Sequence, residues 1–582
     1  MVRPASAAAL VLAAALSVVA AQDKVRVVYL PIDERFTTRT ALINLAGVAS
    51  GLAVLDTPPI ELLSQKAEPA PLDALTSWTA AALDGADAAV ISLEMFVYGG
   101  LVSSRRSNMS EATATARAGA LFELLAEQRA RNPLFRSYVG AVVMRIPSYN
   151  TPAQDFEDPW YWAVHGRDLF EFSFLSSLAA VTGNATIRAE AQRYRSLVPP
   201  SVVNDWLWRR SRNANVTASF LARVPGRPAA PLPPLWPASS AFPALFVTLD
   251  DAAQYGFDVD EANATRAQAA AKGLLGPVVR VYPGADEVGL VTFARVLSDA
   301  ARLAGQPAPL VGLSFRNASS ASLIPNYESQ PMLATALDNL AAAGANVAPW
   351  NGSAATLPPH GAPAGWEALV LVSNFDAEPQ QEAPLQPEGG TQPPNGGFAG
   401  LQGPLCGWEV PVAVADTRLS NGADAALVAW LLRTASASCP AALSGMRRFA
   451  YAGWNTDGNT LGTSVANAVL LALARRGGAA ARADGPAPPV PAPAAANAYF
   501  NTLRLVEDRW WQAGYRASIR AWLAGTPNQT DYDLGDDLPF YAQWAGWPLA
   551  GAARTVSDAF GTGVALRRAF FPWNRTFEIG LE

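Results

Sequence analysis

The sequence predicts an α/β protein: a (β/α)8-type barrel with an inserted small α/β domain and a mostly helical C-terminal segment. Two observations favour this fold. Eight short apolar runs end abruptly in charged or amide side chains, which is typical of buried parallel strands with polar residues at their carboxyl ends. Helix-like sequence separates most of these runs, as expected for successive strand–helix units. Two successive open α/β domains are the alternative that the same pattern allows.

The fifth candidate strand has the sharpest boundary. Its apolar run at residues 245–249 is followed at once by two carboxylates, Asp250 and Asp251. Eight strand–helix units suffice to close a barrel, in which the active site lies at the carboxyl ends of the strands. The eight candidate strands lie in residues 25–35, 51–59, 88–100, 138–150, 244–256, 277–287, 410–424 and 449–462.

Shifts in composition set the expected domain boundaries. In chain order, the expected segments are a signal peptide (residues 1–21), the first part of the barrel (22–299), the inserted domain (300–376), an irregular linker (377–409), the last part of the barrel (410–476), a Pro/Ala-rich linker (477–495) and the helical C-terminal segment (496–582). The inserted domain is assigned from three further apolar runs, at residues 310–315, 346–350 and 368–374. Another proline-rich, irregular stretch covers residues 224–243.

The N-terminus has the pattern of a secretory signal peptide, with Arg3 before a short apolar core and small residues suited to cleavage. We therefore expect a secreted, extracellular protein that keeps no membrane anchor. Cys406 and Cys439 are the only cysteines and should form a disulfide in an oxidising compartment. A high density of glycosylation acceptors is typical of a eukaryotic secretory route: Asn108, Asn184, Asn215, Asn263, Asn317, Asn351, Asn528 and Asn574.

Composition and motifs disfavour several classes of function. The formal net charge of -6 gives no basic surface for nucleic acid. The two histidines, His165 and His360, are too few for most familiar catalytic machinery. The sequence contains no serine-nucleophile elbow, no standard zinc motif and no phosphate-binding glycine loop. No cofactor is predicted, and Mg²⁺ or Ca²⁺ held by carboxylates stays an alternative because their oxygen ligands follow no fixed spacing. The sequence leaves the oligomeric state open.

Carboxylates, aromatic residues and arginines at the strand ends are the candidates for chemistry. Asp250 and Asp251 come first, because two crowded carboxylates do not titrate alike and unequal pKa values suit acid/base catalysis. The reserve catalytic residues, which end other strands, are Glu94, Asp286 and Glu287. The expected substrate-binding residues are Asp33, Glu34, Arg35, Arg145, Tyr255, Trp454, Asn455 and Asn459. Helix capping, turn formation and structural ion pairs are the competing roles for these residue types.

Nine motifs carry a family resemblance: PIDERFTTR, SLEMFVYGGLVSSRR, MRIPSYN, RRSRNANV, TLDDAAQYG, PGADEV, NGAD, YAGWNTDGNTLG and FPWNRTFE. With these motifs, the chain resembles domain of unknown function 4127, a family of bacterial and fungal proteins, over most of its mature length. The sequence departs from the family pattern at Glu34 and Glu94, where aspartates are expected. The resemblance implies no particular activity.

A local resemblance concerns the paired aspartates. A barrel strand that ends in two aspartates is similar to glycosidases in which the 2-acetamido group of the substrate acts as the nucleophile. This likeness implies that Asp251 is the general acid and that Asp250 orients or stabilises the acetamido group. Glycoside hydrolysis needs two such carboxyl groups.

The predicted function is therefore a secreted hydrolase that cleaves glycosidic bonds of an extracellular glycan. The arginine pairs Arg105–Arg106 and Arg209–Arg210 are candidates for binding an acidic substrate group such as a uronate, because arginine suits bidentate recognition of carboxylates. One alternative is a non-catalytic carbohydrate-binding or surface protein. Another is a metal-dependent ester or phosphate hydrolase that uses Asp33, Asp250 and Asp286 as oxygen ligands.

Overall fold

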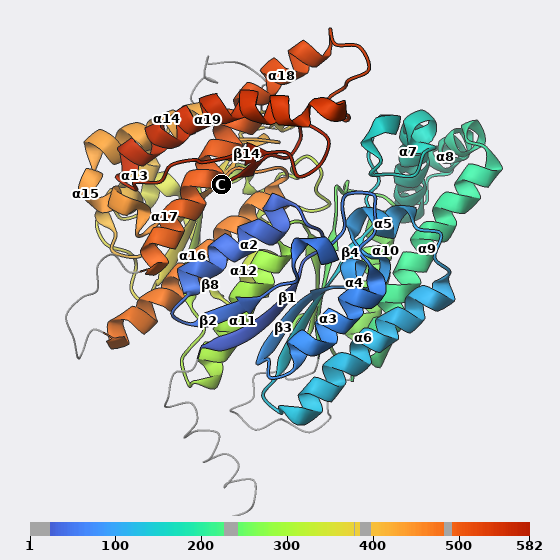
Figure 1. Cartoon of the computed structure of the whole chain (residues 1–582), viewed down its shortest axis with the longest axis horizontal. Coiled ribbons are helices and arrows are strands. Elements are labelled where there is room, and N and C mark those ends of the chain that lie inside the picture. Colours follow the sequence, from blue (N-terminus) through green and yellow to red (C-terminus); the bar gives the residue numbers. More distant parts are fainter. Residues whose placement is uncertain (1–23, 226–242, 378, 384–396, 482–491) are drawn as a thin grey trace, which may run out of the picture.

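The computed structural model describes residues 24–225, 243–377, 379–383, 397–481 and 492–582 (Figure 1). The predicted signal peptide lies outside the described residues, as do nearly all of the proline-rich stretch at residues 224–243 and the central parts of both predicted linkers. Helices and parallel strands alternate along the described chain, so the predicted α/β class is confirmed.

The first half of the chain forms a six-stranded parallel sheet in the order β2-β1-β3-β4-β5-β6. Its strands are β1 (Val25–Leu30), β2 (Ala53–Asp56), β3 (Ala88–Ser92), β4 (Arg136–Val143), β5 (Ala244–Leu249) and β6 (Val279–Pro283). Side chains of β1 alternate between the two faces, because Val28 and Leu30 pack in a different cluster from Val27 and Tyr29. Burial of both faces explains the continuous apolar runs in the sequence.

The second half forms a five-stranded parallel sheet in the order β8-β7-β9-β11-β13. Its strands are β7 (Leu310–Phe315), β8 (Asn346–Ser353), β9 (Ala368–Asn374), β11 (Val412–Thr417) and β13 (Phe449–Ala452). Numbered within its own sheet, this order is 2-1-3-4-5, and the first five strands of the other sheet have the same order. The two halves therefore share one doubly wound topology.

The described strands do not form the predicted closed barrel. All eight predicted barrel strands exist, but six belong to the first sheet and two to the second, and both sheets are open. The strands assigned to an inserted domain, β7 to β9, belong to the second sheet instead, where β9 lies between β7 and β11. A parallel strand looks the same in a barrel and in an open sheet, because its local pattern reports burial and not its neighbours. The alternative prediction was two successive open α/β domains, and the two open parallel sheets agree with it.

Helices cover the faces of both sheets (Figure 1). In the first half they are α2 (Ala41–Ala46), α3 (Leu72–Leu83), α4 (Leu93–Tyr98), α5 (Leu101–Arg106), α6 (Glu111–Arg131), α7 (Trp162–Thr182), α8 (Ala185–Leu197), α9 (Pro200–Arg223), α10 (Phe257–Ala271) and α11 (Val288–Leu303). In the second half they are α12 (Met332–Ala342), α13 (Ala399–Gly407), α14 (Ala425–Arg433), α15 (Pro440–Leu443), α16 (Asp457–Ala481), α17 (Ala492–Leu505), α18 (Arg516–Leu523) and α19 (Leu538–Phe560). The predicted linker at residues 377–409 thus contains α13, and the Pro/Ala-rich linker overlaps the end of α16 and the start of α17.

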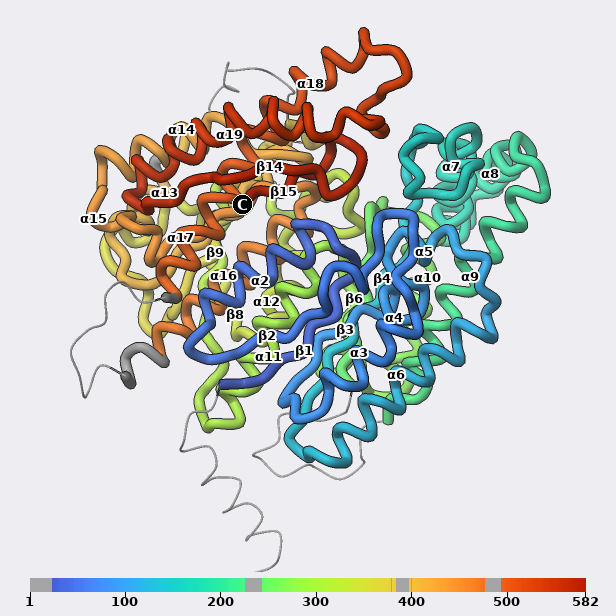
Figure 2. Tube along the Cα trace, in the orientation of Figure 1, coloured from blue at the N-terminus to red at the C-terminus, as the bar shows by residue number. Residues whose placement is uncertain are grey.

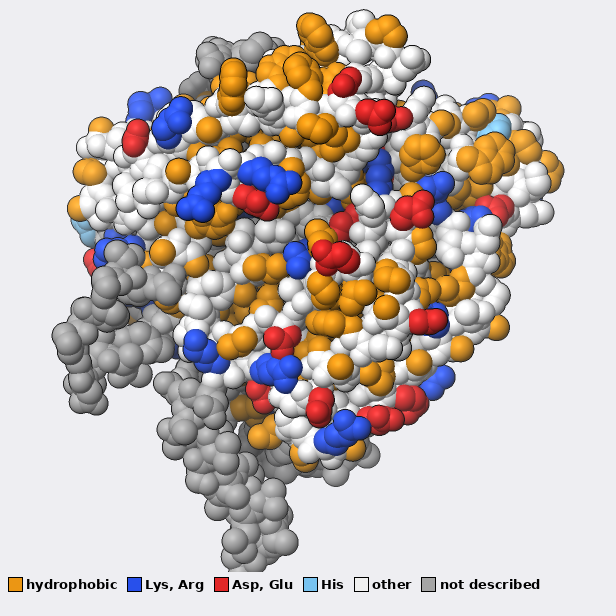
Figure 3. Space-filling view, in the orientation of Figure 1, with side chains coloured by type: hydrophobic (Ala, Val, Ile, Leu, Met, Phe, Trp, Pro, Cys, Tyr) orange, Lys and Arg blue, Asp and Glu red, His pale blue; other side chains and the backbone are white. Residues whose placement is uncertain are grey.

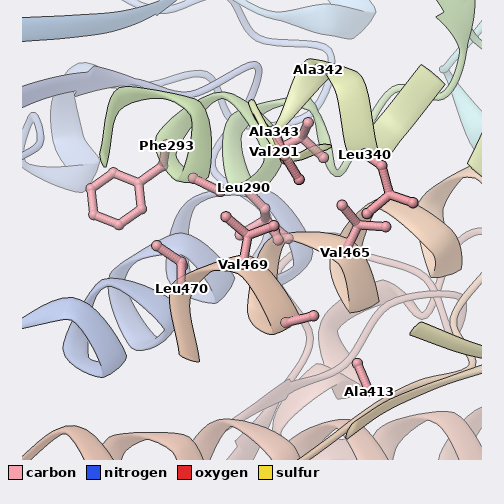
Figure 4. Close-up of a cluster of buried hydrophobic side chains, with 14 of the residues drawn as sticks. Leu290, Val291, Phe293, Leu340, Ala342, Ala343, Ala413, Val465, Val469 and Leu470 are labelled. Atoms are coloured by element: carbon pink, nitrogen blue, oxygen red, sulfur yellow. The ribbon is translucent and has the colours of Figure 1, made fainter. Parts of the chain in front are cut away.

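The two sheets share one apolar core. Helix α11 of the first half packs against α16 of the second, and their buried side chains belong to the same cluster. Figure 4 shows Leu290 and Val291 of α11 close to Val465 and Val469 of α16. Full burial of each such side chain stabilises the protein by about 1.5–3 kcal/mol. This seam fixes the position of one sheet relative to the other.

The C-terminal segment is mostly helical and then returns to the first half. A π-helical stretch (Val506–Tyr515) joins α17 to α18, and the chain ends in the antiparallel strands β14 (Ala569–Phe570) and β15 (Gly580–Leu581). The loop between β14 and β15 extends away from α19 toward the first sheet (Figure 2). A short parallel pair, β10 (Gln381–Glu382) and β12 (Leu419–Ser420), completes the described strands.

In the described part of the chain, no single helix is both long and apolar enough to cross a membrane. The segments Ala425–Ser438 and Pro440–Met446 pass that test only as a pair, and they are bent by 114°.

The predicted disulfide joins Cys406 of α13 to Cys439, which immediately precedes α15. Because the bond closes a loop with a sequence separation of 33 residues, the double variant C406S/C439S should lose about 4 kcal/mol of unfolding free energy in the chain-entropy description. Guanidinium denaturation measures this loss. Wild-type protein under reducing conditions is the control and should match the variant. An unchanged denaturation midpoint would contradict a stabilising role for the disulfide.

Candidate active site

Residues beyond the carboxyl ends of both sheets line a single cavity of about 360 Å³. In open α/β folds, ligands bind in crevices at these strand ends. Residues of the first half that line the cavity are Arg35, Leu101, Arg105, Arg145, Tyr149, Asp155, Glu157, Asp250, Asp251 and Asp286. The second half and the C-terminal segment add Tyr327, Glu382, Ala383, Asn421, Asn455, Arg516, Arg520, Tyr532, Arg575 and Phe577. Figure 3 shows charged side chains in the hollow between the α18–α19 region and the α7–α8 region.

A continuous network of ion pairs lies under and around the cavity, and we call it the inner network. Its five cations are Arg35, Lys66, Arg105, Arg145 and Arg575. Its eight carboxylates are Asp33, Asp155, Glu157, Asp158, Asp250, Asp251, Asp286 and Glu578. With three more carboxylates than cations, the network favours proton retention by some of its acids.

Asp250 and Asp251 both line the cavity but have different surroundings. Asp250 forms an ion pair with Arg105. Asp251 Oδ2 accepts a hydrogen bond from Arg145 Nη1 at 3.1 Å. Burial, reinforced by the charge of Asp250, raises the pKa of Asp251 to about 6, although Arg145 and Arg105 oppose this shift. Asp251 also has a left-handed backbone with a φ of 40°, a strained conformation of the kind that clusters at functional sites.

Arg35 connects the end of β1 to the end of β6. Its Nη2 lies 2.5 Å from Asp286 Oδ1 and its Nη1 lies 3.2 Å from Asp286 Oδ2, while its Nε donates to Asp33 Oδ2 at 2.8 Å. Burial raises the pKa of Asp286 to about 7 even though Arg35 acts to lower it. Arg35 and Asp286 line the cavity, whereas Asp33 is buried and supports Arg35 from behind.

Glu34 has a structural position outside the cavity lining. Its carboxylate accepts hydrogen bonds from Ser64 Oγ at 2.5 Å, from the Lys66 backbone N–H at 2.7 Å and from Trp573 Nε1 at 2.6 Å. These contacts join the loop after β1 to the C-terminal segment. Glu34 therefore helps to hold the site together and does not reach the cavity itself.

Two of the reserve acids also lie outside the cavity lining. Glu94 accepts a hydrogen bond from the Val142 backbone N–H at 2.7 Å and ties α4 to β4, and burial raises its pKa to about 7. Glu287 accepts from the Ala285 backbone N–H at 3.0 Å, and burial raises its pKa to about 8. Of the reserve residues, only Asp286 reaches the cavity.

The expected aromatic and amide ligands are only partly in position. Asn455 lines the cavity. Asn459 is buried, and its Oδ1 accepts a hydrogen bond from the Asp286 backbone N–H at 3.1 Å. Trp454 is also buried, with its ring centroid 5.7 Å from that of Phe577, so its faces are closed to a ligand. Tyr255 packs edge-on against Phe174 away from the cavity lining. The aromatic residues that do line the cavity are Tyr149, Tyr327, Tyr532 and Phe577.

The four arginines that are candidates for binding an acidic substrate group differ in position relative to the cavity. Arg105 lines the cavity, and its Nε and Nη1 find no hydrogen-bond acceptor within the described part of the chain. Arg106 bonds to the backbone carbonyl of Phe156. Arg209 binds backbone carbonyls at the end of α5, and Arg210 pairs with Glu261. The last three therefore have structural roles, and neither His165 nor His360 lines the cavity.

The residues that complete the inner network were not predicted from the sequence. Arg575 Nη1 lies 2.8 Å from Asp155 Oδ1, and Arg575 Nη2 lies 2.9 Å from Glu157 Oε1 and 2.5 Å from Glu578 Oε1. The available signals were the acidic run DFED at residues 155–158 and the motif FPWNRTFE, whose charged residues follow no predicted barrel strand.

The carboxylates proposed as metal ligands pair with arginines instead. Asp33 and Asp286 both bind Arg35, and Asp250 binds Arg105. Within the ranges that the structure describes, no group of three or more His, Cys, Asp or Glu side chains has an arrangement that could hold a metal ion.

Comparison with known proteins identifies one family. A family model described as "Protein of unknown function (DUF4127)" matches residues 27–582, nearly the whole chain. Neither the curated proteins nor the solved structures contain a match to the chain.

The buried acid Glu287 gives a test of the electrostatics around the cavity. Because burial raises its pKa from 4.5 to about 8, its stabilising contribution is complete below about pH 4.5 and is lost as the pH rises through 8. The variant E287Q should therefore show a smaller loss of thermal stability between pH 5 and pH 8 than the wild type. Differential scanning calorimetry measures this, with the exposed-site variant E123Q as the control. An equal pH dependence in E287Q and wild type would contradict the raised pKa.

Proposed function

Because the chain belongs to the DUF4127 family, whose description names no activity, we propose a function from the cavity itself: a secreted hydrolase that cleaves glycosidic bonds of an extracellular glycan by carboxylate acid/base catalysis. The observation that carries this proposal is the unequal environment of the neighbouring residues Asp250 and Asp251. One is paired with Arg105, and the other has a raised pKa and faces the same cavity.

Asp251 is the general acid in this proposal. With a pKa of about 6 it holds a proton in mildly acidic solution and can transfer that proton to the leaving oxygen. Its side chain is 20% exposed and reaches the cavity, so a substrate can contact it. Arg145 fixes the position of the carboxyl group, and the energetic cost of the left-handed backbone at Asp251 is consistent with a functional constraint.

Asp250 is the orienting or stabilising carboxylate. Its ion pair with Arg105 holds a negative charge beside Asp251, where the positive charge of an oxocarbenium-like transition state develops. Tyr149 and Tyr327 offer ring surface to a sugar, and Asn455 offers amide groups to its hydroxyls. A cavity of about 360 Å³ is near the lower end of the range for small-molecule sites, which suits a short stretch of glycan.

The exposure of the glycosylation acceptors supports the proposed secretion. Seven of the eight sequon asparagines are exposed, and Asn317 is half-buried. Oligosaccharides could therefore be attached without unfolding the chain.

Non-catalytic carbohydrate binding is the second candidate function. An exposed groove formed by α18 and α19 is lined by Trp522, Phe540, Trp544 and Trp547, together with Gln543. Large exposed apolar patches often mark binding surfaces. A protein that binds glycan only through this groove would show no hydrolysis and would not need Asp251.

Hydrolysis of 4-nitrophenyl glycosides, with neutral, 2-acetamido and uronic acid sugars in the panel, tests the catalytic roles. The variants D251N and D250N should each lower kcat/KM by at least about 100-fold, because general acid–base groups contribute about 10²–10⁴. The exposed-site variant D84N is the matched control and should keep full activity. Wild-type activity in both cavity variants on the same glycoside would rule out these roles.

The pH dependence of hydrolysis gives an independent test of Asp251. Since the general acid must be protonated, kcat/KM should fall about tenfold for each pH unit above the pKa of about 6. Initial rates between pH 4 and pH 9 measure the profile, and the control is the thermal stability of the protein over the same range. A rate that stays constant up to pH 8 would exclude Asp251 as the acid.

A further inference from the structure

We propose that Arg516 and Arg520 form an anion subsite in the cavity, which receives a carboxylate or sulfate group of the substrate. The nature of the substrate, a glycan, rests on the proposed function, whereas the subsite itself rests on the charges and contacts described below. We call Arg516, Arg520 and the carboxylate between them, Asp531, the outer cluster.

The outer cluster has more positive than negative charge. Arg516 and Arg520 lie one turn apart on α18, and both line the cavity. Among the residues that the structure describes, they share a single carboxylate, since Asp531 Oδ2 is 2.9 Å from Arg520 Nε and 3.5 Å from Arg516 Nη2. The inner network has the opposite imbalance. A negatively charged group is therefore attracted to the outer cluster and not to the carboxylate-rich part of the cavity.

The other contacts of Arg516 are neutral. Its Nε donates to Thr576 Oγ1 at 3.2 Å and its Nη1 donates to Gln512 Oε1 at 3.3 Å. Its guanidinium lies over the ring of Phe577, 4.7 Å from the centroid. These contacts fix the direction of the side chain without neutralising its charge. Burial lowers the pKa of Arg516; Asp531 opposes this shift, and the neighbouring Arg520 and Arg575 add to it, so a bound anion would stabilise the charged guanidinium.

Arg520 is the accessible member of the outer cluster. Its side chain is 38% exposed, and within the described residues Asp531 is its only ion-pair partner. A guanidinium has five N–H donors in a planar fork that matches the oxygens of a carboxylate or a sulfate. Arg520 thus has donors available for a ligand that enters the cavity.

The charge of the whole cavity supports an anionic substrate. Among the described residues, six arginines and six carboxylates line it, so this part of the lining is neutral when fully ionised. Burial raises the pKa of Asp251 to about 6 and that of Asp286 to about 7. In mildly acidic solution both acids are largely protonated, and the lining becomes positively charged. A sugar that carries a carboxylate or a sulfate then binds better than its neutral counterpart.

Calorimetric titration of the full chain at pH 5.5 and low salt tests the subsite, with glucuronic acid, glucose 6-sulfate and glucose as probes. At least one anionic probe should bind about tenfold more tightly than glucose, and the variant R520Q should remove that difference. The carboxylate and sulfate arms identify which anion the subsite takes. The matched control is R568Q, which changes an exposed arginine outside the cavity lining and should bind like the wild type.

The variant R516Q and an increase of salt to 0.5 M are the supporting measurements, and each should weaken binding of the anionic probe. Equal binding of all three probes by wild type, or full anion preference in R520Q, would overturn the subsite. The variant D251N separates the subsite from the catalytic proposal, because it should lose hydrolysis but keep the anion preference. Anion preference without hydrolysis of any glycoside would leave the subsite standing and remove the glycosidase. Hydrolysis of neutral and uronic acid glycosides at equal rates by wild type and R520Q would support the glycosidase and overturn the subsite.

Discussion

Three carboxylates from two distant parts of the chain, Asp155, Glu157 and Glu578, meet the buried guanidinium of Arg575 at distances of 2.5 to 2.9 Å. Removing one partner of a buried ion pair typically costs about 3–5 kcal/mol, because it leaves a charge without compensation in a poorly solvated place. Moving the loop between β14 and β15 away from the first half would separate Arg575 from Asp155 and Glu157, which would be destabilising by a similar amount. This constraint explains why a segment at the far end of the sequence completes a site whose other residues follow strands of both sheets.

The same constraint sets the acidity of the cavity. Burial and, secondarily, the excess of eight carboxylates over five cations in the inner network let some acids stay protonated more readily than they would in water. Asp251 is the member with the clearest consequence, because it combines a pKa of about 6 with access to the cavity. The outer cluster has the opposite excess of charge, because two arginines share one carboxylate there. The proposed chemistry and the proposed anion recognition thus follow from one uneven distribution of charge.

The sequence predicted the local structure well and the long-range structure poorly. All eight candidate strands exist, because a buried parallel strand is determined by its own apolar residues. The prediction of a closed barrel was wrong, because no local sequence pattern indicates which strand pairs with which. At the site, the strand-end residues Arg35, Arg145, Asp250, Asp251 and Asp286 were predicted and do line the cavity. Trp454 is buried and does not line the cavity, and Arg575 was not predicted because its partner Asp155 lies 420 positions away in the sequence.

The shared apolar core between α11 and α16 has a consequence for how the protein exchanges its ligand. Many two-lobed proteins open and close around a hinge, and their lobes separate at low energetic cost. Here the two halves of the chain are joined by a buried apolar seam that includes Leu290 and Val469, so separating the halves would expose many side chains to water. We therefore do not expect the cavity to open by separation of the two halves; Arg520 of the short helix α18 lies in its lining and is accessible.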